Sequence, residues 1–205
     1  MSTDPKDGVI KFKFQLKMSS KLDEKLYIEI EKWRAILFKM NLIGEYPTEQ
    51  IGYGNLSRRI ESQNQFIITG TQTGKYAHLT GSHYTKVTKC DLNKMSVEAI
   101  GPIAPSSESL THFAIYQNCP HIHYVFHVHH PQLWSFMLDN GFESTPSETR
   151  YGTQDMAKAA QTIIGSHKFG IFAMAGHEDG VIAYGSSAQE AGRAILDTMK
   201  LSKNT

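Results

Sequence analysis

The feature that most constrains the fold is the histidine-rich run HIHYVFHVHHP at residues 121–131. Aromatic and β-branched residues alternate along it, and the run closes on Pro131, a pattern that predicts a strand of about six to eight residues. Successive side chains of a strand point to opposite faces of its sheet, so His127 and His129 share a face and His130 points away. Two imidazoles one pleat apart can bind a single metal ion, although a solvent-exposed strand end would show the same spacing.

The remaining pattern mixes helices and strands without a strict strand–helix–strand repeat. Apolar spacing and capping signals predict helices over residues 22–42, 105–120, 131–141, 152–165 and 186–201. Strands are predicted within 51–60, 65–71, 86–90, 96–100, 169–176 and 180–185. These elements indicate an α/β protein with a mixed sheet flanked by helices.

The length of 205 residues predicts one domain with at most a small extension. We expect a solvated, partly flexible N-terminal arm over residues 1–21, where lysines gather, and a single domain over 22–205. Hydrophobic residues make up 40% of the chain, enough for a core, and the net charge of +1 gives no argument for a nucleic acid or an anionic membrane as partner.

Three further observations predict a cytoplasmic protein that does not span a membrane. Cys90 and Cys119 form neither a CxxC pair nor a disulfide framework, which suits a reducing compartment. The N-terminus lacks the layout of a signal peptide, and no apolar stretch approaches the length of a membrane span.

The helix before the histidine strand begins with the segment SSES. Ser106 or Ser107 is predicted to cap it, with Glu108 in its first turn. Two hydroxyls and the backbone N–H groups of a helix start can equally bind an anion. Because the end of this helix leads directly to the histidine strand, Glu108 can face a metal held there, either as a ligand or as a base.

Catalytic zinc usually has three protein ligands and one open position. His177, in the turn between two apolar strands, is the best candidate for the third ligand. The other histidines are interpreted as surface or structural residues: His78, His83, His112, His121, His123 and His167.

Three alternative sites do not fit. The segment GTQTGKY has three residues between its glycines and a tyrosine after the lysine, so it is not a phosphate-binding loop of the Walker type. A cupin would need an acid soon after the second histidine, and HHPQLWSFML has none. An amidohydrolase barrel needs a longer chain.

Seven motifs taken in order resemble the class II (zinc) aldolase family: YGNLSRR, FIITGTQTGK, LTGSHYTKV, PSSESLTHFAIYQ, VFHVHHP, TPSETRYGTQDMA and GHEDGVIAYG. The resemblance covers roughly residues 25–200. This family includes fuculose-phosphate and rhamnulose-phosphate aldolases, ribulose-phosphate 4-epimerase, a methylthioribulose-phosphate dehydratase and the adducin head. It implies a three-layer α/β/α fold around a mixed, largely antiparallel sheet, and a homotetramer.

The resemblance also assigns roles to individual residues. His127, His129 and His177 match the three zinc histidines, and Glu108 matches the carboxylate that ligates zinc at rest and then acts as the base. The residues matched to substrate-phosphate binding are Asn55, Thr73, Gly74, Ser106 and Ser107. Thr73 and Gly74 are preferred to Thr71, in a stretch that is one residue longer than the family pattern.

The implied function is a Zn²⁺-dependent lyase (or one using another divalent ion) that acts on a small phosphorylated ketose through an enediolate, as in aldol cleavage. An epimerase or dehydratase of the same family is an alternative, as is a non-catalytic adducin-like binding module. Two departures separate the chain from the aldolases: the loop DNGFESTPSET is short, and HEDG replaces the usual His-Gly pair. We also expect no counterpart of the C-terminal tail that supplies a tyrosine in relatives.

Overall fold

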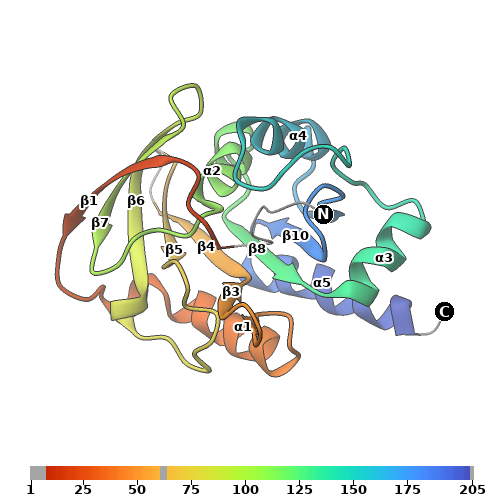
Figure 1. The fold of residues 1–205 in the computed structure, drawn as a ribbon, viewed down its shortest axis with the longest axis horizontal. Coiled ribbons are helices and arrows are strands. Elements are labelled where there is room, and N and C mark those ends of the chain that lie inside the picture. Colours follow the sequence, from red (N-terminus) through yellow and green to blue (C-terminus); the bar gives the residue numbers. More distant parts are fainter. Residues whose placement is uncertain (1–7, 61–63, 204–205) are drawn as a thin grey trace.

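The computed structural model describes residues 8–60 and 64–203 (Figure 1). Within them, eight strands form one sheet in the order β1-β7-β6-β5-β4-β8-β10-β9. Only β1 and β7 run parallel, and every other neighbouring pair is antiparallel. The predicted mixed, largely antiparallel sheet is therefore confirmed.

The strands of the large sheet are β1 (Lys13–Met18), β4 (Asn55–Ile60), β5 (Gln65–Thr69), β6 (Tyr84–Asp91), β7 (Ser96–Gly101), β8 (Tyr124–His129), β9 (Gly170–Ala173) and β10 (Gly180–Gly185). A separate antiparallel pair consists of β2 (Gly44–Tyr46) and β3 (Ile51–Tyr53). The helices are α1 (Ile28–Lys39), α2 (Ser109–Asn118), α3 (Pro131–Asp139), α4 (Gln154–Ile164) and α5 (Ala188–Lys203).

Helices cover both faces of the sheet, which gives the three layers seen in Figure 1. Helices α1, α3 and α5 pack on one face, over a core that includes Phe126 and Val128 of β8. Helices α2 and α4 pack on the other face, over a core that includes Val125 of the same strand. The alternation of β8 thus places its successive side chains in two different cores.

Most predicted helix starts are confirmed by their caps. Helix α3 begins at Pro131 as predicted. The Thr153 hydroxyl accepts the Met156 N–H at 3.2 Å and caps α4, and the Ser187 hydroxyl accepts the Glu190 N–H at 3.1 Å at the start of α5.

The predicted cap of α2 is wrong. This helix begins at Ser109, and its N-cap residue is Glu108, whose side chain makes no capping hydrogen bond. The hydroxyl of Ser106 accepts the N–H of Glu108 at 3.3 Å. Ser106 instead starts a turn, because its carbonyl accepts both the N–H of Ser109 at 3.1 Å and the hydroxyl of Ser109 at 2.7 Å. Ser106 and Ser107 therefore precede the helix and are available to line a site.

Part of the N-terminal segment expected to be a flexible arm forms strand β1 at the edge of the sheet. The segment KFKFQLKM alternates apolar and polar residues as a strand does, and its backbone pairs with β7. Most side chains of β1 are exposed, as expected of a solvated segment. Residues 1–7 lie outside the described part of the chain, and the proposed domain start at residue 22 stays a prediction.

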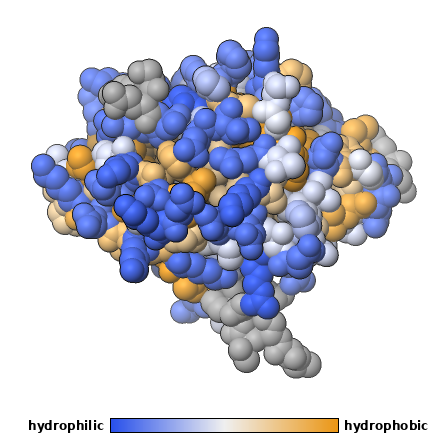
Figure 2. Space-filling view, turned by 90° about the horizontal axis from the view of Figure 1, so that it is seen from above, coloured by the Kyte–Doolittle hydropathy of each residue, from blue (hydrophilic) through white to orange (hydrophobic). Residues whose placement is uncertain are grey.

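The surface is polar over the face shown in Figure 2, where apolar residues form separate patches among hydrophilic ones. Among residues 8–60 and 64–203, no helix combines the length and the apolar character that crossing a bilayer would require.

Arg34 of α1 is buried beneath the loop that follows β5. Its guanidinium donates to the carbonyl of Thr73 at 3.1 Å, of Gly74 at 3.3 Å and of Tyr76 at 2.5 Å. Burial lowers the pKa of Arg34 from its usual value, but it stays charged because that value is far above neutrality. Helix α1 thereby fixes the backbone of residues 73–77.

We predict that Arg34→Met destabilises the protein by about 3 kcal/mol, because buried carbonyls would lose charge-assisted hydrogen bonds. Urea unfolding followed by circular dichroism measures this free energy. Lys32→Met, an exposed change on the same helix, is the control and should shift it by less than about 0.5 kcal/mol. Equal midpoints for the two variants would show that Arg34 does not hold the loop.

Candidate active site

Strand β8 presents two histidines on the face covered by α2 and α4. His127 pairs with Asn55 of β4 on one side, and His129 pairs with Gly180 of β10 on the other. Directly paired residues of antiparallel strands project to the same face, so Asn55 lies beside His127 on this face. The predicted sharing of one face by His127 and His129 is confirmed.

The turn between β9 and β10 brings His177 to these two residues. The N–H of His177 donates to the Met174 carbonyl and the N–H of Gly180 donates to the His177 carbonyl, each at 2.9 Å. One ring nitrogen from each histidine lies within 4.8 Å of the others. The three side chains are at most 3% exposed. We call His127, His129 and His177 the histidine triad.

Outer contacts of two triad residues, His127 and His129, direct their Nε2 atoms inward. Nδ1–H of His127 donates to the Val181 carbonyl at 3.2 Å, and Nδ1 of His129 contacts the Tyr46 hydroxyl at 3.0 Å. The two Nε2 atoms consequently face each other at 2.9 Å. Neutral imidazoles oriented by such outer hydrogen bonds are the usual zinc-ligand set, so the donor chemistry fits a divalent metal.

Glu108 is completely buried at the N-cap of α2. Its carboxylate is not part of the group of ligand atoms that lie within 4.8 Å of one another. Its roles as fourth ligand and as base therefore stay predictions. Its helix is nevertheless on the face of the triad, because His112, one turn later, contacts Ser57 of β4 at 2.6 Å.

A small polar hollow collects all five residues predicted to bind the substrate phosphate. It is lined by Asn55 of β4, by Thr73 and Gly74 of the loop after β5, and by Ser106 and Ser107 before α2. Thr71, the less favoured alternative, lines it as well. Residues far apart in the sequence thus converge next to the triad, since Asn55 pairs with His127.

Two structural features bear on the prediction that this hollow binds a ligand. Oδ1 of Asn55 is buried and has no hydrogen-bond partner among the described residues, and such an atom is costly unless water or a ligand satisfies it. A Cβ at Gly74 would lie 2.1 Å from the Gly44 carbonyl oxygen, so only glycine lets this loop approach β2.

Comparison with protein families identifies the architecture. The family described as Class II Aldolase and Adducin N-terminal domain matches residues 40–203. The chain belongs to this family. No curated protein matches the chain.

Solved structures of the class II aldolase fold agree. YgbL from Escherichia coli is 20% identical with a TM-score of 0.68, and the match covers 88% of each chain. L-fuculose-1-phosphate aldolase from Thermus thermophilus is 19% identical with a TM-score of 0.64, covering 89% of this chain and 93% of that one. A sugar-phosphate aldolase from Thermotoga maritima is 16% identical with a TM-score of 0.65, covering 88% and 93%. At these identities the likeness shows the fold.

One buried network beside the site was not predicted. The Ser57 hydroxyl contacts Nδ1 of His112 at 2.6 Å and the hydroxyl of Tyr116 at 2.7 Å. Burial lowers the pKa of His112 to about 3, so this imidazole is neutral at pH 7. The structural interpretation of His112 therefore agrees with its position, where it anchors α2 on β4. The sequence signal that could have revealed this network is residue spacing. Ser57 lies two residues after Asn55 on a strand, and His112 lies four residues after Glu108 at the start of a helix, so each pair shares a face.

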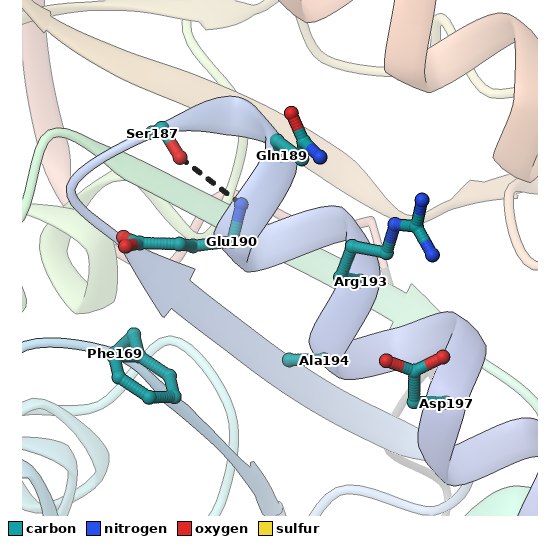
Figure 3. A pocket seen from close by; sticks show the side chains of 7 residues that line it. All are labelled: Phe169, Ser187, Gln189, Glu190, Arg193, Ala194 and Asp197. Atoms are coloured by element: carbon teal, nitrogen blue, oxygen red, sulfur yellow. Dashed lines mark hydrogen bonds between the residues drawn. The ribbon is translucent and has the colours of Figure 1, made fainter.

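A larger hollow elsewhere is not the class II aldolase site. It encloses about 480 Å³ beside the first turns of α5, and Phe169, Arg193 and Asp197 are among the residues that line it (Figure 3). It lies near the end of β10 that pairs with Tyr124, whereas the triad lies at the end that pairs with His129. Among the described residues, its lining contains no histidine or cysteine.

We predict that the triad binds one zinc ion per chain and that His177→Ala weakens this binding by about 100-fold or more. Losing even an outer contact of a zinc histidine costs about 10- to 100-fold, and a ligand should cost at least as much. Elemental analysis and chelator competition measure the stoichiometry and the affinity. The exposed His167→Ala is the matched control. A wild-type zinc content near zero that added zinc does not restore would refute the metal site.

Proposed function

We propose that the chain is a metal-dependent lyase that cleaves a small phosphorylated ketose by an aldol-type reaction. The observation that carries this proposal is the buried histidine triad lying next to a polar hollow suited to a phosphate. The names of two fold neighbours, a fuculose-phosphate aldolase and a sugar-phosphate aldolase, support the same class of reaction.

The hollow would bind the substrate phosphate. The hydroxyls of Ser106 and Ser107, the amide of Asn55 and the loop at Thr73 and Gly74 offer uncharged hydrogen-bonding groups around one small space. A phosphate held there places the carbons of a short ketose beside His127, because Asn55 is the strand partner of that histidine. Such positioning converts binding energy into rate.

The triad would hold Zn²⁺ or another divalent ion, and Glu108 would be its exchangeable fourth ligand. A metal ion bound there supplies Lewis acidity to a carbonyl oxygen of the substrate. Glu108, once released, would accept a proton from the carbon or hydroxyl next to that carbonyl and later return it. Its complete burial keeps bulk water from competing for this proton.

We predict that the zinc-loaded protein exchanges carbon-bound hydrogen of dihydroxyacetone phosphate with solvent deuterium, and that Glu108→Gln slows this exchange by about 100-fold or more. The glutamine keeps the size of the side chain but cannot accept the proton. Proton NMR in D₂O follows the reaction, and zinc content is measured in parallel. Glu98→Gln, an exposed change on β7, is the control.

Absence of deuterium exchange would contradict the proposed reaction. If zinc is bound but wild-type protein shows no exchange, the aldolase assignment fails, and a different substrate class or a non-catalytic adducin-like module is favoured.

We further propose that the protein is cytoplasmic, because its two free cysteines suit a reducing compartment. We also propose that it is a homotetramer, as the resemblance to the class II aldolases implies. Light scattering at micromolar concentration should give about four times the mass of one chain. A monomer at that concentration would refute the assembly and weaken the proposed function, because the resemblance to the class II aldolases implies an active site near a subunit boundary.

A further inference from the structure

The segment Gly8–Phe12 crosses the candidate active site. It precedes the residues that match the family, which begin at residue 40. We propose that this segment is a strap that closes the site and that Lys11 on it contacts the anionic substrate and selects phosphorylated ketoses. The inference rests on the proposed function and deepens it.

The first anchor of the strap is at the polar hollow. Gly8 lines the hollow together with Ser106 and Ser107. The carbonyl of Gly8 accepts a hydrogen bond from Nε2 of Gln72 at 3.1 Å, and Oε1 of Gln72 accepts one from the N–H of Gly52 at 2.7 Å. Gln72 lies in the TGTQTGK stretch and has a positive φ of 57°. Its side chain therefore connects the strap to β3.

The backbone at this anchor requires glycine. Gly8 has a φ of +77°, and a Cβ there would lie 2.3 Å from Nε2 of Gln72 and 2.8 Å from Cγ2 of Ile51. A larger residue would be strained and would push the segment away from the loop.

The second anchor is the start of strand β1. Phe12 is 7% exposed and packs in the core beneath α2 and α4. The N–H of Lys13 donates to the Met95 carbonyl at 2.9 Å. Because both ends of the strap are held, the position of Lys11 between them is defined.

Lys11 contacts Tyr151, which stacks on the triad residue His177, and its stem lies close to Ser107 of the hollow. Its Nζ is 3.7 Å from the centroid of the Tyr151 ring, and that ring stacks on His177 with centroids 4.8 Å apart. A Cβ at Gly152 would lie 3.5 Å from Cδ of Lys11 and 3.7 Å from the carbonyl oxygen of Ser107. The lysine stem is thus close to Ser107 of the hollow, and the ammonium group lies against Tyr151, donating to its carbonyl at 3.4 Å.

The charge of Lys11 is what the hollow lacks. Every residue that lines the hollow among the described ones is glycine, serine, threonine, asparagine or glutamine, so no charged side chain faces a bound phosphate. The nearby Arg34 is turned toward backbone carbonyls, and Lys75 is 3.8 Å from Glu45. A cation beside a phosphate dianion strengthens its binding through a charge-assisted hydrogen bond, and the half-buried Lys11 can supply one by turning from the Tyr151 carbonyl toward the hollow.

The proposal is tested by titration calorimetry on the zinc-loaded protein. The ligands are dihydroxyacetone phosphate and unphosphorylated dihydroxyacetone. We expect Lys11→Met, which keeps the stem on Tyr151, to weaken phosphoketone binding about 10-fold, the equivalent of about 1.4 kcal/mol, and to leave the neutral ketone unchanged. Lys11→Arg should restore binding to within about threefold. Lys13→Met removes the same charge from the exposed β1 and is the matched control.

A second variant tests the strap without changing the lysine. Gly8→Val should displace the segment and weaken phosphoketone binding in the same direction, with the zinc content unchanged. If Lys11→Met binds the phosphoketone as wild type does, the role of Lys11 is refuted and the proposed function stands. If zinc-loaded wild type binds no phosphoketone at all, the proposed function fails, and the role of Lys11 fails with it.

Discussion

The register of strand β8 is the constraint on which the rest of the site depends. Phe126 and Val128 are fully buried against α1, α3 and α5, whereas His127 and His129 project to the opposite face. A slip of one residue would exchange these two sets, placing imidazoles in an apolar core and apolar side chains at the site. Apolar burial, worth about 25 cal/mol per Å², therefore keeps the triad histidines on the correct face without any contribution from a ligand.

The same strand joins several parts of the site. Its neighbour β4 carries Asn55, and its other neighbour β10 begins just after the turn that carries His177. The strand histidines, Asn55 and the His177 turn are therefore connected through one hydrogen-bonded ladder. Buried polar groups need partners, and His127 and His129 find them in the Val181 carbonyl and the Tyr46 hydroxyl. Both contacts orient rings before any ligand arrives, which is the condition for tight metal binding.

Local patterns in the sequence predicted the parts of this fold that depend on near neighbours. The alternation in β8, Pro131 at the start of α3 and the Thr153 cap of α4 all act within one or two turns of chain. The start of α2 was misplaced because the Ser106 turn mimics a cap in sequence. The bonds of Arg34 to the loop carbonyls and of Gln72 to Gly8 join residues about 40 and 64 positions apart, and no local pattern contains them.

These long-range contacts make the loop after β5 the junction of the site. Arg34 holds this loop from the side of α1, and Gln72 extends from it to the strap. Between those two attachments the loop presents Thr73 and Gly74 to the hollow. The cation of Arg34 is committed to carbonyls and is kept behind the loop, so the hollow is polar but uncharged. The charge that we propose for substrate binding therefore comes from outside the loop, from Lys11 of the strap.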